Sequence, residues 1–201
     1  MPEYTAFFYG TLMHPKILMR VIANDGHHLR LCPAVLLDHT RHKVKYADYP
    51  GVIPFDKAKC LFEHSLTQGE KSVRGTLVTG LTAKDIYALD VFEGSEYTRE
   101  SVPAHPLDSL RDISAYALEQ GSLPAHPPPL PATFELLPAI PAQTYIYRDE
   151  KNLEAQLWSY EDFVKKNAWK WHGEAADNNE DITEVDRRRE NGQKEIEALE
   201  A

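Results

Sequence analysis

Residues 7–12 read Phe-Phe-Tyr-Gly-Thr-Leu, and this stretch decides how the fold is expected to begin. The segment from Glu3 to Tyr9 alternates and is rich in aromatic side chains, a pattern typical of a strand. The pair Gly10-Thr11 turns the chain, and Pro15 then stands where proline is favoured, at the first residue of a helix. The sequence therefore predicts a strand, a glycine turn and a helix in direct succession.

A second informative stretch, Leu89 to Arg99, reads Leu-Asp-Val-Phe-Glu-Gly-Ser-Glu-Tyr-Thr-Arg. A capping-box variant at Thr82 begins the helix that precedes it, and Gly94 supplies the left-handed residue that ends the helix. Glu93 continues the apolar face of this helix, so its carboxylate is expected at the edge of the core. Desolvation and the outward-pointing carbonyls of the helix end are expected to favour the protonated acid there. The spacing alone equally allows a solvated carboxylate at a frayed helix end.

The turn Tyr9-Gly10-Thr11-Leu12 offers backbone N–H groups at the entry to the following helix. Such groups can hold a carboxylate or a developing oxyanion, because the positive end of a helix adds to the attraction. The alternative is a tight turn in which glycine serves backbone geometry only. The stretch has neither the lysine and hydroxyl of a Walker loop nor the glycines of a dinucleotide fingerprint. An anion cradle and one acid are the parts that metal-free proton transfer needs.

The composition limits the number of domains and the kind of partner. With 201 residues, 42% of them hydrophobic, the chain suits one well-cored domain of about 150 residues with appendages. The net charge of -9 argues against a nucleic-acid partner. No apolar run approaches 20 residues and the N-terminus lacks a signal-peptide layout, so we expect no membrane span and a cytoplasmic location. Cys32 and Cys60 are then expected to be reduced thiols.

The chain is expected to divide into a domain over residues 1–173 and an acidic tail over residues 174–201. The tail holds ten acidic and four basic side chains and is expected to be helical or mobile, and it is a possible contact for a protein partner. Nine of the 14 prolines fall between Pro103 and Pro141. Because proline lacks an N–H donor, this stretch is expected to be a long insertion outside the sheet, with a short helix around Leu107 to Ala117.

The remaining strands are expected around this insertion and before it. Tyr97 to Val102 and Gln143 to Tyr147 alternate, Arg74 to Thr79 is β-like, and Ala34 to Tyr46 reads as one long β-like segment. Tyr49 to Pro54 is expected to break regular structure twice, because it contains two prolines and a glycine.

Other chemistries find less support in the sequence. No serine or cysteine sits in a glycine-flanked elbow with an evident base, so a hydrolytic triad is not expected. His39 and His42 are three apart in a predicted strand, where they would point to opposite faces, and no cysteine joins them. We therefore expect both histidines at the surface, no metal site and no cofactor.

Four motifs occur in order along the first half of the chain. They are Tyr9-Gly10-Thr11-Leu12, Tyr49 to Pro54, Val73-Arg74-Gly75 and Leu89 to Arg99. In this order and spacing the chain resembles the gamma-glutamylcyclotransferase-like superfamily, and within it the avirulence-induced, defence-protein-like branch. The resemblance spans about Ala6 to Val102 and resumes at residues 144–147 and 157–163. It implies an α+β fold, a small mixed β-barrel with flanking helices.

The resemblance also implies a reaction. A γ-glutamyl amide or peptide, the small-molecule substrate, would cyclise to 5-oxoproline and release its amine, with Glu93 acting first as general base and then as general acid. The turn from Tyr9 to Leu12 would hold the α-carboxylate of the substrate. Tyr97 and Arg99 share one face of a predicted strand and are candidates for orienting the substrate, and Tyr145 is a candidate for lining the pocket. The alternatives are barrel packing for the two tyrosines and a solvated surface for the arginine.

The sequence also departs from the family pattern. The turn continues into Met13-His14-Pro15, whereas the members that act on γ-glutamylamines place a lysine directly after the leucine, so that substrate does not carry over. Two other functions remain open. One is a tailoring lyase or cyclase acting on a specialised metabolite, and the other is a non-catalytic ligand-binding module of the same fold that responds to stress.

Overall fold

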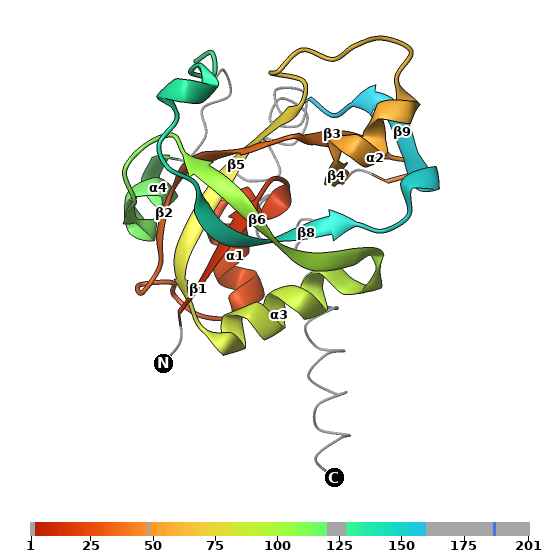
Figure 1. Cartoon of the computed structure of the whole chain (residues 1–201). Coiled ribbons are helices and arrows are strands. Elements are labelled where there is room, and N and C mark those ends of the chain that lie inside the picture. Colours follow the sequence, from red (N-terminus) through yellow and green to blue (C-terminus); the bar gives the residue numbers. More distant parts are fainter. Residues whose placement is uncertain (1–2, 48, 120–127, 160–186, 188–201) are drawn as a thin grey trace.

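The computed structural model describes residues 3–47, 49–119, 128–159 and 187 (Figure 1). Within these residues a ring of strands closes into a barrel. The strands are β1 (Tyr4–Phe8), β8 (Ile140–Tyr147), β6 (Tyr97–Pro106), β2 (Arg30–Leu37) and β5 (Ser72–Leu81), in that order, and β5 pairs back onto β1. All these pairings are antiparallel except that of β1 with β8, which is parallel. The barrel is therefore mixed, and the prediction of an α+β barrel fold is confirmed.

A smaller sheet and a few helices complete the described part. The sheet has the order β4 (Pro50–Pro54), β3 (His39–Val44), β9 (Leu153–Leu157). The helices α1 (Pro15–Ile22) and α3 (Ala83–Glu93) contact each other, and Figure 1 shows α3 crossing one end of the barrel, away from the smaller sheet. The shorter elements are α2 (Phe55–Ala58), α4 (Ile113–Glu119), the two-residue strand β7 (Arg111–Asp112) on β2, and the 3-10 turns η1 (Thr11–Met13), η2 (Lys59–Leu61), η3 (Gly94–Glu96), η4 (Thr133–Glu135) and η5 (Glu150–Asn152).

The strand β1 is buried on both faces, which explains its nearly continuous apolar sequence. Ala6 and Phe8 join the cluster that α1 and α3 cover, whereas Phe7 and Tyr9 join the cluster shared with β3 and β4. Successive side chains of a strand point to opposite sides, so β1 separates the two clusters. Tyr9 is consequently held on the side of the smaller sheet, directly before the glycine turn.

Both main helices begin where the sequence predicts. Pro15 occupies the first turn of α1, and the side chain of His14 accepts a hydrogen bond from the Lys16 N–H group. Thr82 caps α3 in a capping box with Asp85. The helix α3 ends at Glu93, and Gly94 follows with φ of 69°. Gly94 is in the positive-φ region that glycine adopts without a steric penalty, so Glu93 is the last helical residue.

Several prolines stand inside strands, contrary to expectation. The segment from Tyr49 to Pro54 is not a double break but forms β4. Among the described strands β4 pairs only with β3, so it is an edge strand there. Likewise β6 and β8 extend into the predicted insertion, where Pro103 pairs with Pro141. At that point neither residue is paired on its other side, so a missing N–H group can be tolerated. The predicted insertion is therefore shorter, and its helix, α4, begins at Ile113 and not at Leu107.

Two further expectations are corrected in the smaller sheet. The segment from Ala34 to Tyr46 is two strands in different sheets, separated by Asp38, whose φ is 54°. His42 is fully buried, not at the surface, because its ring nitrogens bond to the Thr40 hydroxyl at 2.8 Å and the Glu154 carbonyl at 2.9 Å. One near partner, Thr40, and one far along the chain, Glu154, thus make burial of this polar ring possible.

Other expectations concern thiols, membranes and the tail. Cys32 is buried and Cys60 is exposed, and neither forms a disulfide, as predicted. In the described ranges no helix has both the length and the apolar character needed to cross a membrane. The predicted acidic tail, residues 174–201, lies outside the described residues except for Arg187.

Candidate active site

The glycine turn presents three backbone donors at the end of β1. The first N–H group that donates within the turn is that of Met13, which bonds to the Gly10 carbonyl at 3.0 Å. The N–H groups of Gly10, Thr11 and Leu12 come before it and have no acceptor inside the turn, as at the start of any helix. The structure therefore places three successive backbone donors where the sequence predicts an anion cradle.

A proline from the smaller sheet joins the turn to the strand that follows Glu93. A Cβ atom on Gly10 would lie 3.4 Å from Cγ of Pro50, so the proline ring packs against the glycine. The carbonyl of Pro50 accepts a 3.0 Å hydrogen bond from the Tyr97 hydroxyl. Pro50 thus links β6 to the turn.

Glu93 is half-buried at the end of α3 and lies close to three tyrosines. Burial raises the pKa of Tyr9, and the charge of Glu93 raises this pKa further. Burial is also the main reason why the pKa values of Tyr97 and Tyr145 are raised, and Glu93 contributes to both. The charge of the carboxylate at the end of α3 is therefore felt by Tyr9, the residue before the glycine turn.

The side chain of Tyr9 is part of the barrel interior. Its hydroxyl donates a hydrogen bond to the carbonyl of Tyr145, and the backbone of Val52 also bonds to the phenol. Only 7% of Tyr9 is exposed. The phenol of Tyr9 is therefore committed to the fold, and it is the backbone after Tyr9 that can serve a ligand.

Tyr145 and Arg99 meet at a second carboxylate, that of Asp90. The Tyr145 hydroxyl donates to Oδ1 of Asp90 at 3.0 Å, and Nε of Arg99 lies 2.9 Å from the same oxygen. Asp90 precedes Glu93 by one helical turn, so these contacts anchor β8 and β6 to the end of α3. The structure thus brings Tyr145 and Arg99 near Glu93, and their contact with a substrate stays a prediction.

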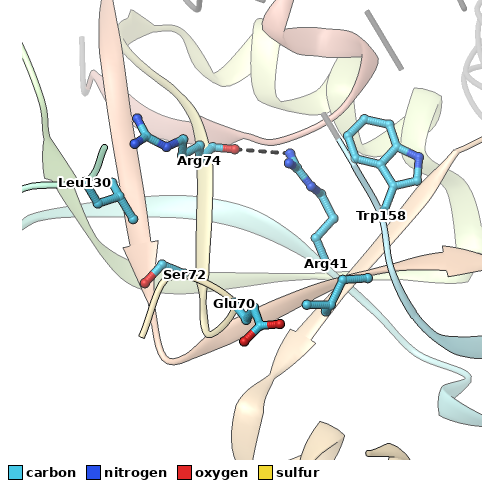
Figure 2. Close-up of a pocket in the computed structure, with 8 residues that line it drawn as sticks. Arg41, Glu70, Ser72, Arg74, Leu130 and Trp158 are labelled. Atoms are coloured by element: carbon cyan, nitrogen blue, oxygen red, sulfur yellow. Dashed lines mark hydrogen bonds between the residues drawn. The ribbon is translucent and has the colours of Figure 1, made fainter. Parts of the chain in front are cut away.

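Sequence analysis overlooked one buried cation at the turn. Arg41 is 9% exposed, and its Nη1 atom donates to the carbonyls of Tyr9 at 2.8 Å and Arg74 at 3.2 Å. Figure 2 shows its guanidinium group between the Arg74 carbonyl and Trp158, whose ring centroid lies 4.4 Å from Cζ. The run Thr40-Arg41-His42 reads as exposed in a linear sequence, so only the distant acceptors could have disclosed this arginine.

A cavity of about 320 Å³ lies beside Arg41. Arg41, Glu70, Ser72 and Arg74 line its polar part, and Leu130, Leu157, Trp158 and Gly69 complete it. Among the residues with assigned positions, no group of three or more histidine, cysteine or acidic side chains is arranged to hold a metal ion.

Comparison with known proteins identifies the family of this chain. Residues 6–170 match the family described as Gamma-glutamyl cyclotransferase, AIG2-like. From Arabidopsis thaliana, Protein AIG2 C is 26% identical over 111 residues, which cover 55% of this chain and 58% of the relative, and AIG2-like protein C is 28% identical over 110 residues, 55% of each. The chain therefore spans little more than half the length of these curated relatives.

A solved structure gives the same picture of the fold. The solution structure of a further Arabidopsis thaliana protein superposes with a TM-score of 0.53 at 18% identity, over 85% of this chain and 78% of the other. At this identity the likeness concerns the fold alone. Since the family match covers most of the sequence, the chain belongs to the AIG2-like gamma-glutamyl cyclotransferase family.

Proposed function

We propose that this protein is a cyclotransferase-type enzyme that converts a γ-glutamyl amide or peptide into 5-oxoproline and a free amine. Family membership supports the general chemistry. The observation that carries the proposal is the position of Glu93, half-buried at the end of α3 and near enough for its charge to raise the pKa of Tyr9, the residue before the turn predicted for binding.

The reaction needs one proton carrier and no external nucleophile. The α-amino nitrogen of the substrate attacks its own γ-carbonyl carbon, a new C–N bond closes the five-membered lactam, and the original amide C–N bond breaks. The amine attacks in its neutral form, so an ammonium group first gives up one proton. The proton that the nitrogen then loses as the ring closes passes to the leaving nitrogen, so atoms balance without water. Since nucleophile and electrophile belong to one molecule, correct positioning alone contributes several kcal/mol, on the order of 7–11 at best.

Glu93 is the residue best suited to carry that proton. An α-amino group has a pKa of roughly 7.7–8.0 and is largely protonated at neutral pH, so a base must first remove a proton. The phenols of Tyr9, Tyr97 and Tyr145 have raised pKa values and stay neutral, so they cannot be that base. Glu93, half-buried beside them, takes the proton and returns it to the leaving amine.

The donors of Gly10, Thr11 and Leu12 bind the α-carboxylate of the substrate in this proposal. Backbone N–H groups at a helix start are suited to a carboxylate because they are preorganised and lie at the positive end of the peptide dipoles. Tyr97 and Tyr145 shape the site from its sides, and Arg99 orients the substrate through its charge.

A panel of γ-glutamyl amines and γ-glutamyl peptides tests the proposal. Each compound is incubated with the wild-type protein and with Glu93→Gln, and 5-oxoproline is detected by mass spectrometry. We expect turnover by the wild type and its loss in Glu93→Gln, which keeps the shape of the side chain but cannot carry a proton. Glu100→Gln is the matched control, since Glu100 is an exposed carboxylate on β6.

The outcomes separate the possible functions. Equal turnover by Glu93→Gln and the wild type would rule out Glu93 as the base. No turnover of any compound, together with a ligand-induced rise in melting temperature, would favour a non-catalytic binding module. Formation of another cyclic or cleaved product from a specialised metabolite would favour the tailoring lyase or cyclase.

A further inference from the structure

We infer that Arg41 is a positioning residue for the anion cradle. By holding the carbonyl of Tyr9 it directs the N–H group of Gly10 toward the carboxylate of the substrate. This inference rests on the proposed function, because it assigns to the turn a carboxylate ligand.

The geometry of one peptide unit links Arg41 to the cradle. Nη1 of Arg41 lies 2.8 Å from the Tyr9 carbonyl oxygen, and the same peptide unit carries the Gly10 N–H group. A trans peptide is planar with its C=O and N–H bonds pointing in opposite directions, and no described peptide bond is cis. The Gly10 N–H group therefore points away from Arg41. A charged donor on the oxygen also polarises the unit and strengthens its N–H group as a donor.

The pairing of β3 with β4 holds Tyr9 at two points. Arg41 and Val52 are register partners across these strands. Arg41 bonds to the backbone carbonyl of Tyr9, and the backbone of Val52 bonds to its phenol. One pair of opposed residues thus fixes both the side chain of Tyr9 and the orientation of the peptide that follows it.

Trp158 keeps the guanidinium group of Arg41 in place. The backbone N–H group of Trp158 donates to the Arg41 carbonyl at 2.8 Å. Cζ of Arg41 lies 4.4 Å from the centroid of the Trp158 ring, which stands beside the guanidinium group in Figure 2. The second acceptor of Nη1, the Arg74 carbonyl at 3.2 Å, ties the group to β5 as well. Because the group is buried and stacked, it loses little additional freedom when a ligand binds.

The neighbouring arginine provides a matched comparison. Arg74 lines the same cavity of about 320 Å³, but its guanidinium group donates to the carbonyl of Pro128 and not to Tyr9. Arg74→Met thus removes one positive charge from this cavity and leaves the bond to the Tyr9 carbonyl intact. Arg41→Met removes both the charge and the bond.

The experiment measures ligand binding and turnover in parallel on the whole chain. Proton–nitrogen NMR spectra of the wild type, Arg41→Met, Arg41→Lys and Arg74→Met are followed during titration with 5-oxoproline, and KM and kcat are measured with the best γ-glutamyl substrate. We expect the wild type to shift the Gly10, Thr11 and Leu12 amide signals. In Arg41→Met the Kd for 5-oxoproline and the KM should rise by about tenfold, the effect of losing a charged hydrogen bond, with a smaller change in kcat. Arg74→Met should resemble the wild type.

Chemical rescue distinguishes positioning from a general loss of structure. In Arg41→Met the guanidinium group is replaced by the shorter thioether of methionine beside the existing cavity, so free guanidinium ion can occupy the place of the lost group. Guanidinium chloride on the order of 10 mM, far below the molar concentrations that unfold proteins, should lower the KM of Arg41→Met and leave that of Arg74→Met unchanged. If Arg41→Met does not fold, Arg41→Lys decides the matter: it keeps the charge but lacks the planar donor, so its KM should still rise.

Each result has a separate meaning. The inference is overturned if Arg41→Met folds and keeps the Kd and KM of the wild type, or if Arg41→Lys keeps the KM of the wild type. In either case, turnover by the wild type leaves the proposed function standing. A wild type that binds 5-oxoproline through the Gly10 amide but converts no substrate leaves the inference standing and overturns the proposed function. Absence of both binding and turnover overturns both.

Discussion

The hydroxyl of Tyr97 donates a 3.0 Å hydrogen bond to the carbonyl of Pro50, whose ring lies against Gly10. This contact joins the strand after Glu93 to the turn that carries the proposed carboxylate site. The acid and the cradle come from opposite ends of the first hundred residues. Pro50, which lies between them in sequence, contacts both the turn and the strand that follows the acid. The predictions below test this arrangement and the stability of the barrel that supports it.

Tyr97→Phe removes the contact with little change in shape. We expect the free energy of unfolding to fall by about 1 kcal/mol, because the buried carbonyl of Pro50 loses its donor. Turnover should fall as well, since the turn is less firmly placed relative to Glu93. Urea unfolding and 5-oxoproline formation measure the two effects. Tyr49→Phe is the control, because the Tyr49 hydroxyl bonds to the exposed carboxylate of Glu96. A larger loss of stability in the control would contradict the prediction.

Two glycines of the site region should respond differently to alanine. A Cβ atom on Gly75 would lie 2.2 Å from the Phe8 carbonyl oxygen and 2.5 Å from Cζ of Phe7, whereas on Gly10 the nearest atom is Cγ of Pro50 at 3.4 Å. Gly75→Ala should therefore lower the free energy of unfolding by about 3 kcal/mol or more, and Gly10→Ala by about 1 kcal/mol at most.

Denaturant unfolding of both alanine variants gives the comparison directly. Gly10→Ala is expected to remain folded at room temperature, because the added methyl group only comes into ordinary van der Waals contact with the ring of Pro50. If Gly75→Ala proves as stable as Gly10→Ala, the close approach of β5 to β1 is not as the structure has it.

Asp85 should make the protein sensitive to acid. Burial acts to raise the pKa of its carboxyl group, but hydrogen bonds from Thr82, His28 and Asn24 outweigh burial and hold the pKa below the ordinary value of 3.8. A carboxylate whose pKa is lowered by folding contributes stability above its unfolded pKa and loses it as the pH falls through the folded pKa. The free energy of unfolding should therefore decrease below about pH 4.

Asp85→Asn tests this source of acid sensitivity. At pH 7 the free energy of unfolding of the variant should be about 1–2 kcal/mol lower than that of the wild type, because an amide no longer matches the donors of the helix cap. Between pH 5 and pH 3 this free energy should fall less steeply than in the wild type. Urea unfolding at several pH values in this range gives the slope of the free energy of unfolding against pH. Asp56→Asn serves as control, because the Asp56 side chain is 91% exposed. An unchanged slope in Asp85→Asn would remove Asp85 as the cause.

His42 should make the free energy of unfolding depend on pH in a second, less acidic range. Burial lowers its pKa below 6.5, and the hydrogen bond to the Glu154 carbonyl offsets this only in part. The unfolded chain therefore takes up a proton before the folded one does, and stability is complete above about pH 6.5 and declines as the pH falls below it.

In His42→Gln the free energy of unfolding should decrease less between pH 7 and pH 5 than it does in the wild type. Some decline should remain, because burial also lowers the pKa of His39. Thermal or urea unfolding at several pH values provides the measurement, with His27→Gln as control, since the His27 side chain is 80% exposed. A variant that keeps the full wild-type slope would show that His42 does not titrate in this window.

The local features of the site could be predicted from the sequence because each depends on residues only a few positions apart. Gly10 before a helix start, the proline at Pro15, the cap at Thr82 and the helix end at Glu93 all belong to this class. Short-range sterics and backbone hydrogen bonds specify such features, and the structure agrees with them.

Predictions failed where the environment of a residue depends on a distant strand. The segment from Tyr49 to Pro54 forms β4, because an edge strand tolerates proline, and which strand lies at an edge is a property of the whole sheet. His42 is buried because the Glu154 carbonyl supplies a partner from far along the chain.

The sequence by itself therefore determined a glycine turn before a helix and an acid at the end of another, since near neighbours supply the forces that shape both. Only the tertiary structure decided that the charge of Glu93 acts on Tyr9, and that Arg41 and Pro50 stand beside the turn. The physical reason is that buried polar groups need partners, and for Arg41 on β3 the partners are the carbonyls of Tyr9 and Arg74, which the packing of the smaller sheet against the barrel brings within reach.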